Sequence, residues 1–361
     1  MQVLGKRLPN AETFSKALVN LALPERAKKP LIVAYYLTFR CNARCGFCSQ
    51  KQFVYGEQRD KYRTDLKTQL RVLEAIRADT PNVYLMGGEP TVDRNLALLL
   101  AKCESLGFDT IAVNTNGIVF RQEILENANV LVISLHSMDP SKIASVYGLP
   151  EAVGDRVLEN IQRYAESGTG VAVTINSVIT GDNIEDIYDV AAFCRGIGAK
   201  FNVSPAISPG GRPDTTIMNN DRYRKLIDWC IERPSLMAPT LACLEVVRDL
   251  KPFVCMPNTI PGVYPNGDVV APCPEFSEGL VPVNILQAGG LNKAIVAGRR
   301  SFEAEHGAFD TRNCAGLCHK TCYIEAANIS TLTGVVRLAT GMPLRLRRTN
   351  AKTENLSADE V

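Results

Sequence analysis

The amino-acid sequence predicts an α/β fold in which six βα units with a parallel sheet precede a smaller, cysteine-rich α+β part. Short β-branched runs alternate with longer amphipathic runs from Pro30 to about residue 235. This alternation is typical of βα units and a parallel sheet, and six units are fewer than the eight of a full barrel. Beyond residue 235 the alternation stops and cysteines become dense.

The expected strands of the first part are residues 31–38, 82–87, 110–115, 130–136, 171–178 and 200–206. The helices expected with them are 63–79, 93–106, 120–128, 151–167, 183–197 and 218–233. The second part is expected to hold a hairpin over 262–272 and helices over 236–250, 286–303 and 319–334. The hairpin follows from Asn266-Gly267, which lies between two β-prone runs. The chain thus divides into an N-terminal extension (1–29), a βα region (30–235), a cysteine-rich region (236–335) and a basic, then polar tail (336–361).

Composition and charge narrow the class of protein. The chain has 361 residues, of which 46% are hydrophobic and 22% charged, as in a soluble globular protein. A formal net charge of +2 argues against nucleic-acid binding through overall charge. We expect no transmembrane segment and a cytoplasmic location, because no apolar run approaches about 18 residues and polar residues interrupt the N-terminal segment.

Cysteines are the most informative residue type. The chain has 12 cysteines and only 3 histidines, without a secretory signal. Cysteines in that context are more often metal ligands or catalytic groups than disulfides. The small number of histidines argues against a His-rich metal site.

Three of the cysteines form a short loop after the first expected strand, in the run FRCNARCGFCSQ (39–50). Thiolates at such close spacing can wrap one face of an iron–sulfur cluster, and three ligands leave one iron open. One alternative is three unrelated buried cysteines. Another is a structural zinc site, which normally has a fourth Cys or His nearby, and none is local here.

Cys41-x3-Cys45-x2-Cys48, with Phe47 before the last cysteine, resembles the signature loop of the radical S-adenosylmethionine (SAM) superfamily. The resemblance implies a partial (β/α)6 TIM-like barrel and an oxygen-sensitive 4Fe-4S cluster whose open iron chelates SAM. It also implies reductive cleavage of SAM to methionine and a 5′-deoxyadenosyl radical, which abstracts hydrogen from a substrate. An electron donor such as flavodoxin or ferredoxin is then required.

Other motifs at strand ends extend the resemblance. Gly87-Gly88-Glu89-Pro90 is similar to the family's GGE motif, which contacts the amino group of SAM; alone, it would be read as a turn. Weaker cofactor-binding candidates lie at later strand ends, and turn or structural roles are their alternatives: Asn114, Asn116, Ser134, His136, Asn176 and Ser204. Arg212 could pair with a carboxylate, but we favour a solvated loop charge.

A second cysteine set follows in the C-terminal half: Cys255, Cys273, Cys314, Cys318 and Cys322. It resembles the SPASM/twitch extension of radical SAM enzymes, and implies one auxiliary iron–sulfur cluster of the 4Fe-4S type. Cys255 and Cys273 are the firmest ligands, and we favour Cys318 and Cys322 for the other two. A structural zinc site is the alternative.

The expected function is hydrogen abstraction from a small-molecule or lipid substrate, followed by net oxidation or bond formation. The reaction class, oxidoreductase or C–C/C–X bond-forming, stays open. Only about 29 residues precede the first strand, too few for a peptide-recognition module. The alternatives are a peptide maturase with a separate recognition partner, a non-catalytic scaffold and an RNA-modifying enzyme, which near-neutral charge disfavours. The arginines of residues 335–348 allow peripheral contact with anionic lipid, although a solvated tail is the commoner meaning.

Overall fold

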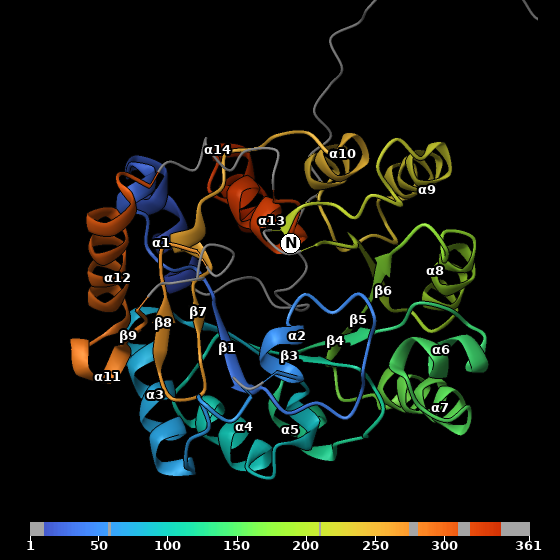
Figure 1. Cartoon of the computed structure of the whole chain (residues 1–361), viewed down its shortest axis with the longest axis horizontal. Coiled ribbons are helices and arrows are strands. Elements are labelled where there is room, and N and C mark those ends of the chain that lie inside the picture. Colours follow the sequence, from blue (N-terminus) through green and yellow to red (C-terminus); the bar gives the residue numbers. More distant parts are fainter. Residues whose placement is uncertain (1–10, 57–58, 209–210, 274–280, 310–317, 341–361) are drawn as a thin grey trace, which may run out of the picture.

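Six parallel strands, adjacent in chain order, form the curved inner wall of the molecule (Figure 1). The computed structural model describes residues 11–56, 59–208, 211–273, 281–309 and 318–340. The six strands are β1 (Val33–Thr38), β2 (Asn82–Gly87), β3 (Thr110–Thr115), β4 (Val130–Ser134), β5 (Ala172–Ile179) and β6 (Lys200–Pro205). The predicted partial barrel is confirmed.

The predicted helices of the barrel also form, and they pack on the outer face of the sheet. They are α3 (Leu66–Asp79), α4 (Leu96–Ser105), α5 (Gln122–Asn127), α7 (Ala152–Glu166), α8 (Asp186–Gly196) and α9 (Asp221–Ile231). The sequence did not predict α1 (Ala11–Ala22), α2 (Lys51–Val54) or α6 (Pro140–Tyr147). A usable signal marked α6, because Asp139 caps it, Pro140 opens it and Gly148 ends it at φ 63°.

Alternation along each strand separates the packed face from the inner face. On β2, Val83 and Leu85 are fully buried in the main core with Val72 and Ile76 of α3. Tyr84 lies between them in sequence, and its side chain packs on the opposite, inner face of the sheet. Side chains two residues apart share a face of a strand. The outer face is therefore apolar core, and the inner face is left for a cavity.

The predicted hairpin continues the same sheet. β7 (Gly262–Val263) pairs parallel with β1, and β8 (Asp268–Val270) and β9 (Val283–Asn284) follow antiparallel. Gly267 turns the hairpin at φ 90°, which a side chain there would oppose. The Phe201 amide of β6 also bonds the Leu236 carbonyl at 2.9 Å. The chain beyond residue 235 is thus hydrogen-bonded to both ends of the barrel sheet.

The C-terminal helices are α10 (Leu241–Asp249), α11 (Ile285–Ala288), α12 (Leu291–His306), α13 (Thr321–Ile329) and α14 (Leu332–Thr340). α10 begins five residues later than predicted, because Pro239 precedes it and Thr240 caps it. α13 and α10 lie across the open side of the curved sheet, between β7 and β6 (Figure 1). Among the described residues, no helix has the length and apolarity to cross a membrane. Cys314 and the tail from residue 341 lie outside the described residues.

Candidate active site

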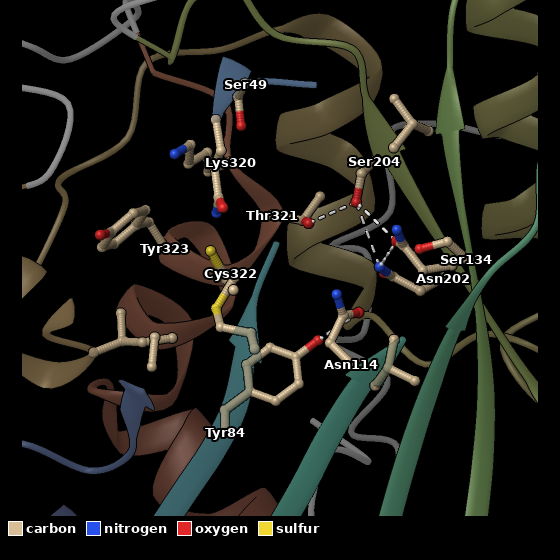
Figure 2. Close-up of a pocket in the computed structure, with 18 of the residues that line it drawn as sticks. Ser49, Tyr84, Asn114, Ser134, Asn202, Ser204, Lys320, Thr321, Cys322 and Tyr323 are labelled. Atoms are coloured by element: carbon tan, nitrogen blue, oxygen red, sulfur yellow. Dashed lines mark hydrogen bonds between the residues drawn. The ribbon is translucent and has the colours of Figure 1, made fainter. Parts of the chain in front are cut away.

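The inner face of the barrel surrounds a cavity of about 450 Å³. The cysteine loop lines one end of it, and Ala17 of α1 lines another part. Most of the residues predicted from sequence line this cavity: Cys41, Cys45, Phe47, Cys48, Gly87, Gly88, Glu89, Asn114, Asn116, Ser134, His136, Asn176, Ser204 and Cys322. Figure 2 shows part of the cavity, with Ser49 of the cysteine loop and several residues of α13 labelled.

The cysteine loop is held by backbone bonds to the neighbouring strand. The Gly88 amide donates to the Thr38 carbonyl at 2.7 Å, and the Glu89 amide donates to the Arg40 carbonyl at 2.8 Å. On the other side, the Tyr55 hydroxyl donates to the Ala43 carbonyl at 2.6 Å. The end of β2 therefore fixes where the loop leaves β1.

The two glycines are required by packing against that loop. A Cβ atom on Gly87 would lie 2.2 Å from the Thr38 carbonyl oxygen, and one on Gly88 would lie 2.4 Å from the Arg40 carbonyl oxygen. Gly87 also has a φ of 142°, which side-chain-bearing residues avoid. The close approach that glycine permits here is between two backbone segments of this chain.

The three loop thiols are free and sit in a desolvated environment. Burial raises the pKa of Cys41 to about 11 and that of Cys45 to about 12, and it also raises the pKa of Cys48. Such thiols become thiolates only beside added positive charge, which iron supplies. In the described part of the chain, no three such side chains converge on one metal ion. A cluster binds each thiolate at a different iron, so three thiols on one loop are the donor set for a cluster with one open iron.

Glu89 organises the turn that follows β3. Its side chain is 2% exposed. One carboxylate oxygen accepts from the Thr91 amide and hydroxyl and from the Thr115 hydroxyl, and the other accepts from the Asn116 amide at 2.7 Å. Burial raises the pKa of Glu89, although these bonds oppose the shift. Glu89 therefore positions Asn116 beside the cysteine loop, where the Asn116 amide group donates to Asn42 at 2.8 Å.

His136 is a neutral, buried group facing the cysteine loop. Burial lowers its pKa to about 4. Its Nδ1 accepts from the Val178 amide at 3.1 Å, so we assign the proton to Nε2. The Phe47 ring packs edge-on against the imidazole at 4.9 Å between centroids. His136 can therefore offer one N–H donor to a ligand in the cavity.

A polar network lines the opposite wall, and sequence reasoning missed half of it (Figure 2). The Ser204 hydroxyl donates to Asn176 Oδ1 at 3.1 Å and lies 2.9 Å from the Thr321 hydroxyl of α13. Asn202 also donates to Asn176 Oδ1. Asn202 lies two residues before Ser204 on β6, so strand alternation could have found it. Thr321 is brought in by the tertiary fold.

A second hydrogen-bonded pair, Tyr84 and Asn114, spans β2 and β3 in the same wall. The Tyr84 hydroxyl donates to Asn114 Oδ1 at 3.1 Å. Tyr84 lies three residues before Gly87, and alternation along β2 places it on the inner face (Figure 2). The pair contributes a hydroxyl and an amide to the cavity.

The described C-terminal cysteines gather around Tyr323 of α13. Cys255 and Cys318 pack with Tyr323 in one small buried cluster. Burial raises the pKa of Tyr323 well above its usual value, and Cys273 and Cys322 raise it further. Cys322 faces the cavity beside Tyr84 (Figure 2). Cys255, Cys273 and the Cys318–Cys322 segment, far apart in sequence, thus all approach Tyr323 in the fold.

Two predicted site residues lie elsewhere. Arg212 is exposed and does not line the cavity, which agrees with the solvated reading of its charge. Its neighbour Gly211 packs against Cys318, where a Cβ atom would meet the sulfur at 2.7 Å. Pro90 is buried just behind Glu89, in a short 3₁₀ helix.

A family model described as the radical SAM superfamily matches residues 35–194, the segment that holds the cysteine loop and the Glu89 turn. Residues 35–194 are a radical SAM domain. Members of this family use a 4Fe-4S cluster and SAM. Cys41, Cys45 and Cys48 all lie within the matched segment.

Curated relatives of this chain include proteins named as GTP 3′,8-cyclases. A probable GTP 3′,8-cyclase of Saccharolobus solfataricus is 25% identical over 237 residues, covering 61% of this chain and 75% of the relative. The GTP 3′,8-cyclase of Aquifex aeolicus is 28% identical over 186 residues, covering 49% and 57%.

The fold is shared with two solved radical SAM structures. Streptococcus suis SuiB bound to S-adenosylmethionine aligns with a TM-score of 0.57 at 20% identity, covering 72% of this chain and 64% of SuiB. The chain therefore spans just under two thirds of the SuiB length. A histidine-tagged anSMEcpe with bound AdoMet aligns with a TM-score of 0.52 at 14% identity, covering 86% and 99%.

Proposed function

We propose that this radical SAM enzyme abstracts hydrogen from a small molecule held between the cysteine loop and α13. The observation that carries the proposal is the single cavity, which joins the three loop thiols to the polar wall of Asn176, Ser204 and Thr321. When bound, the cluster and SAM supply a 5′-deoxyadenosyl radical after one electron arrives from a donor such as flavodoxin or ferredoxin.

In this reaction the protein positions the cofactors and the substrate, and it excludes water from the cavity. The loop thiols hold the cluster, and the bonds from Gly88 and Glu89 fix the loop. His136 offers its Nε2–H, and Asn116 and Ser134 add polar groups to the lining of the cavity. These side chains are assigned to SAM, which leaves the wall near α13 for the substrate.

The size of the cavity favours a small substrate. A volume of about 450 Å³ lies within the range of small-molecule sites, and SAM must share it. The inner surface near α13 combines amides and hydroxyls with the phenol rings of Tyr84 and Tyr323. Such a lining suits a polar organic molecule with some apolar surface.

We further propose an auxiliary iron–sulfur cluster held by Cys255, Cys273, Cys318 and Cys322, as in a SPASM/twitch domain. The support is their gathering around Tyr323 at the cavity wall. In that position the cluster would take an electron from the substrate radical, so the net result is oxidation or bond formation. A structural zinc ion is the competing occupant, and metal analysis separates the two.

The names of the relatives supply the first substrates to test. Two curated relatives are GTP 3′,8-cyclases, and one solved SuiB structure is bound to a precursor peptide. GTP represents the small-molecule class, and a peptide with a separate recognition partner represents the alternative. Product formation from GTP or from peptide would each identify the class directly.

The deciding experiment is anaerobic reconstitution followed by iron and sulfide counting and a SAM-cleavage assay with dithionite. We expect wild type to release methionine and 5′-deoxyadenosine. Cys45→Ala should lose the iron of one cluster, about four atoms per chain, together with SAM cleavage. Cys194→Ala, a fully buried thiol of α8 away from the cavity, is the matched control and should keep both. Reduced wild-type protein that leaves SAM intact would refute the proposal.

A further inference from the structure

Buried polar atoms without partners belong mostly to residues that line the cavity. Within the described ranges, six buried side-chain nitrogen or oxygen atoms lack a hydrogen-bond partner. Five of the six belong to residues that line the cavity: Gln50, Asn82 and Glu325, and His319, whose imidazole lies against the Leu250 and Lys251 carbonyls. Buried polar groups in folded proteins nearly always have a partner. Their concentration in one cavity therefore indicates a ligand that supplies the missing bonds.

Glu325 has the strongest need for a partner, because a carboxylate carries charge. One of its oxygens, Oε1, accepts from the Thr240 amide at the start of α10. The other, Oε2, is buried and unpartnered. No ion pair joins Glu325 to a cation in the described part of the chain.

The surroundings of Glu325 do not compensate the charge. Pro239 and Ala326 line the cavity beside it and offer no side-chain donor. The buried Cys243 thiol is hydrogen-bonded to Glu325, and its pKa is raised well above normal, first by burial and then by the Glu325 charge and this bond. A protonated thiol is a weak hydrogen-bond donor. A buried carboxylate needs a charged or strongly donating partner.

We propose that the Glu325 carboxylate binds a cationic nitrogen of the substrate, an ammonium or guanidinium group. The substrate class is then a small organic cation whose charged end lies at α13 and α10, with its remaining part extending toward the cysteine loop. Calling this cation the substrate rests on the proposed function. Its binding does not, because the binding follows from the cavity and the unpartnered carboxylate. Glu325 is thus a recognition residue.

The test measures binding of three probes of equal length to the reconstituted holoprotein with SAM, by isothermal titration calorimetry. The probes are n-butylammonium, 1-butanol and butyrate. We expect n-butylammonium to bind at least about tenfold more tightly than the neutral and anionic probes. Glu325→Gln keeps an oxygen for the Thr240 amide but removes the charge, and it should weaken n-butylammonium binding about tenfold. Glu245→Gln, an exposed carboxylate of α10, should bind as wild type.

Equal binding of n-butylammonium and 1-butanol would overturn the proposal, as would unchanged binding by a folded Glu325→Gln protein. Thermal melts by circular dichroism show whether that variant is folded. If the variant is unfolded, the binding of the three probes to the wild-type protein decides the proposal alone. SAM cleavage is measured in parallel without any probe. Its absence refutes the proposed function, whereas the binding results still decide the role of Glu325.

Discussion

Burial decides the charge of His136, and with it what this residue can offer a ligand. The side chain is 4% exposed and its pKa is lowered to about 4 from an ordinary value of 6.5. The imidazole is therefore neutral at pH 7, with Nδ1 occupied by the Val178 amide. A charged imidazolium would instead repel the sulfonium of SAM, so neutrality suits the proposed site.

The lowered pKa of His136 predicts acid sensitivity. The unfolded chain binds this proton below about pH 6.5 and the folded chain only near pH 4, so stability falls as pH drops through that window. We expect this group to remove up to about 3 kcal/mol of unfolding free energy between those values. His136→Asn should flatten that part of the curve, whereas His306→Gln, an exposed control, should not. Urea unfolding at a series of pH values measures both.

The contact between the end of β2 and the cysteine loop is a property of two elements together. Gly87 and Gly88 allow β2 to approach the backbone that follows β1, and two hydrogen bonds then fix the loop. Residues outside the cysteine loop, at the end of β2, thus set the position of the loop. We therefore expect cluster binding and strand packing to be coupled through this contact.

Gly88→Ala should weaken both cluster binding and strand packing. The added Cβ would lie 2.4 Å from the Arg40 carbonyl oxygen, which belongs to backbone and cannot turn away. We expect a loss of about 3 kcal/mol in stability and a lower iron content after reconstitution. Gly46→Ala is the control within the same loop, because a Cβ there meets nothing within 4 Å. Equal iron content in the two variants would contradict the coupling.

At the level of the whole molecule, the two regions predicted from sequence share one nine-stranded sheet. β7 covers the edge of β1, and the Tyr35 hydroxyl of β1 donates to the Pro265 carbonyl at 3.1 Å. Residues 236–238 likewise pair with β6. The barrel therefore depends on the chain beyond residue 235 at both ends of its sheet.

A chain ending at residue 235 should consequently fail to fold as the barrel does in the full protein. It would leave β1 with an open edge and lose the core residues of α10 and α12. We expect aggregation or a broad, non-cooperative melt by circular dichroism, against one cooperative transition for the full chain. A sharp melt of the shortened chain would show that residue 235 marks a true domain boundary.

Local sequence patterns were sufficient for the strands and for the cluster loop. β2 and β3 begin and end where the pattern predicts, because apolar β-branched runs bounded by turn residues carry strand signals within a few neighbouring residues. Cys41, Cys45 and Cys48 lie within one loop, so their spacing alone indicates the chemistry. The helix α1 was missed because its packing partner α14 lies more than 300 residues away.

The sequence by itself determined the βα order, the cysteine loop and the chemistry that the loop supports, because each depends on residues close together in the chain. Only the tertiary structure decided what faces that loop. Thr321, Cys322 and Glu325 of α13 reach the cavity because the chain returns across the open side of the barrel. Contacts between residues so far apart in sequence leave no local pattern, so the substrate wall had to be found in the fold.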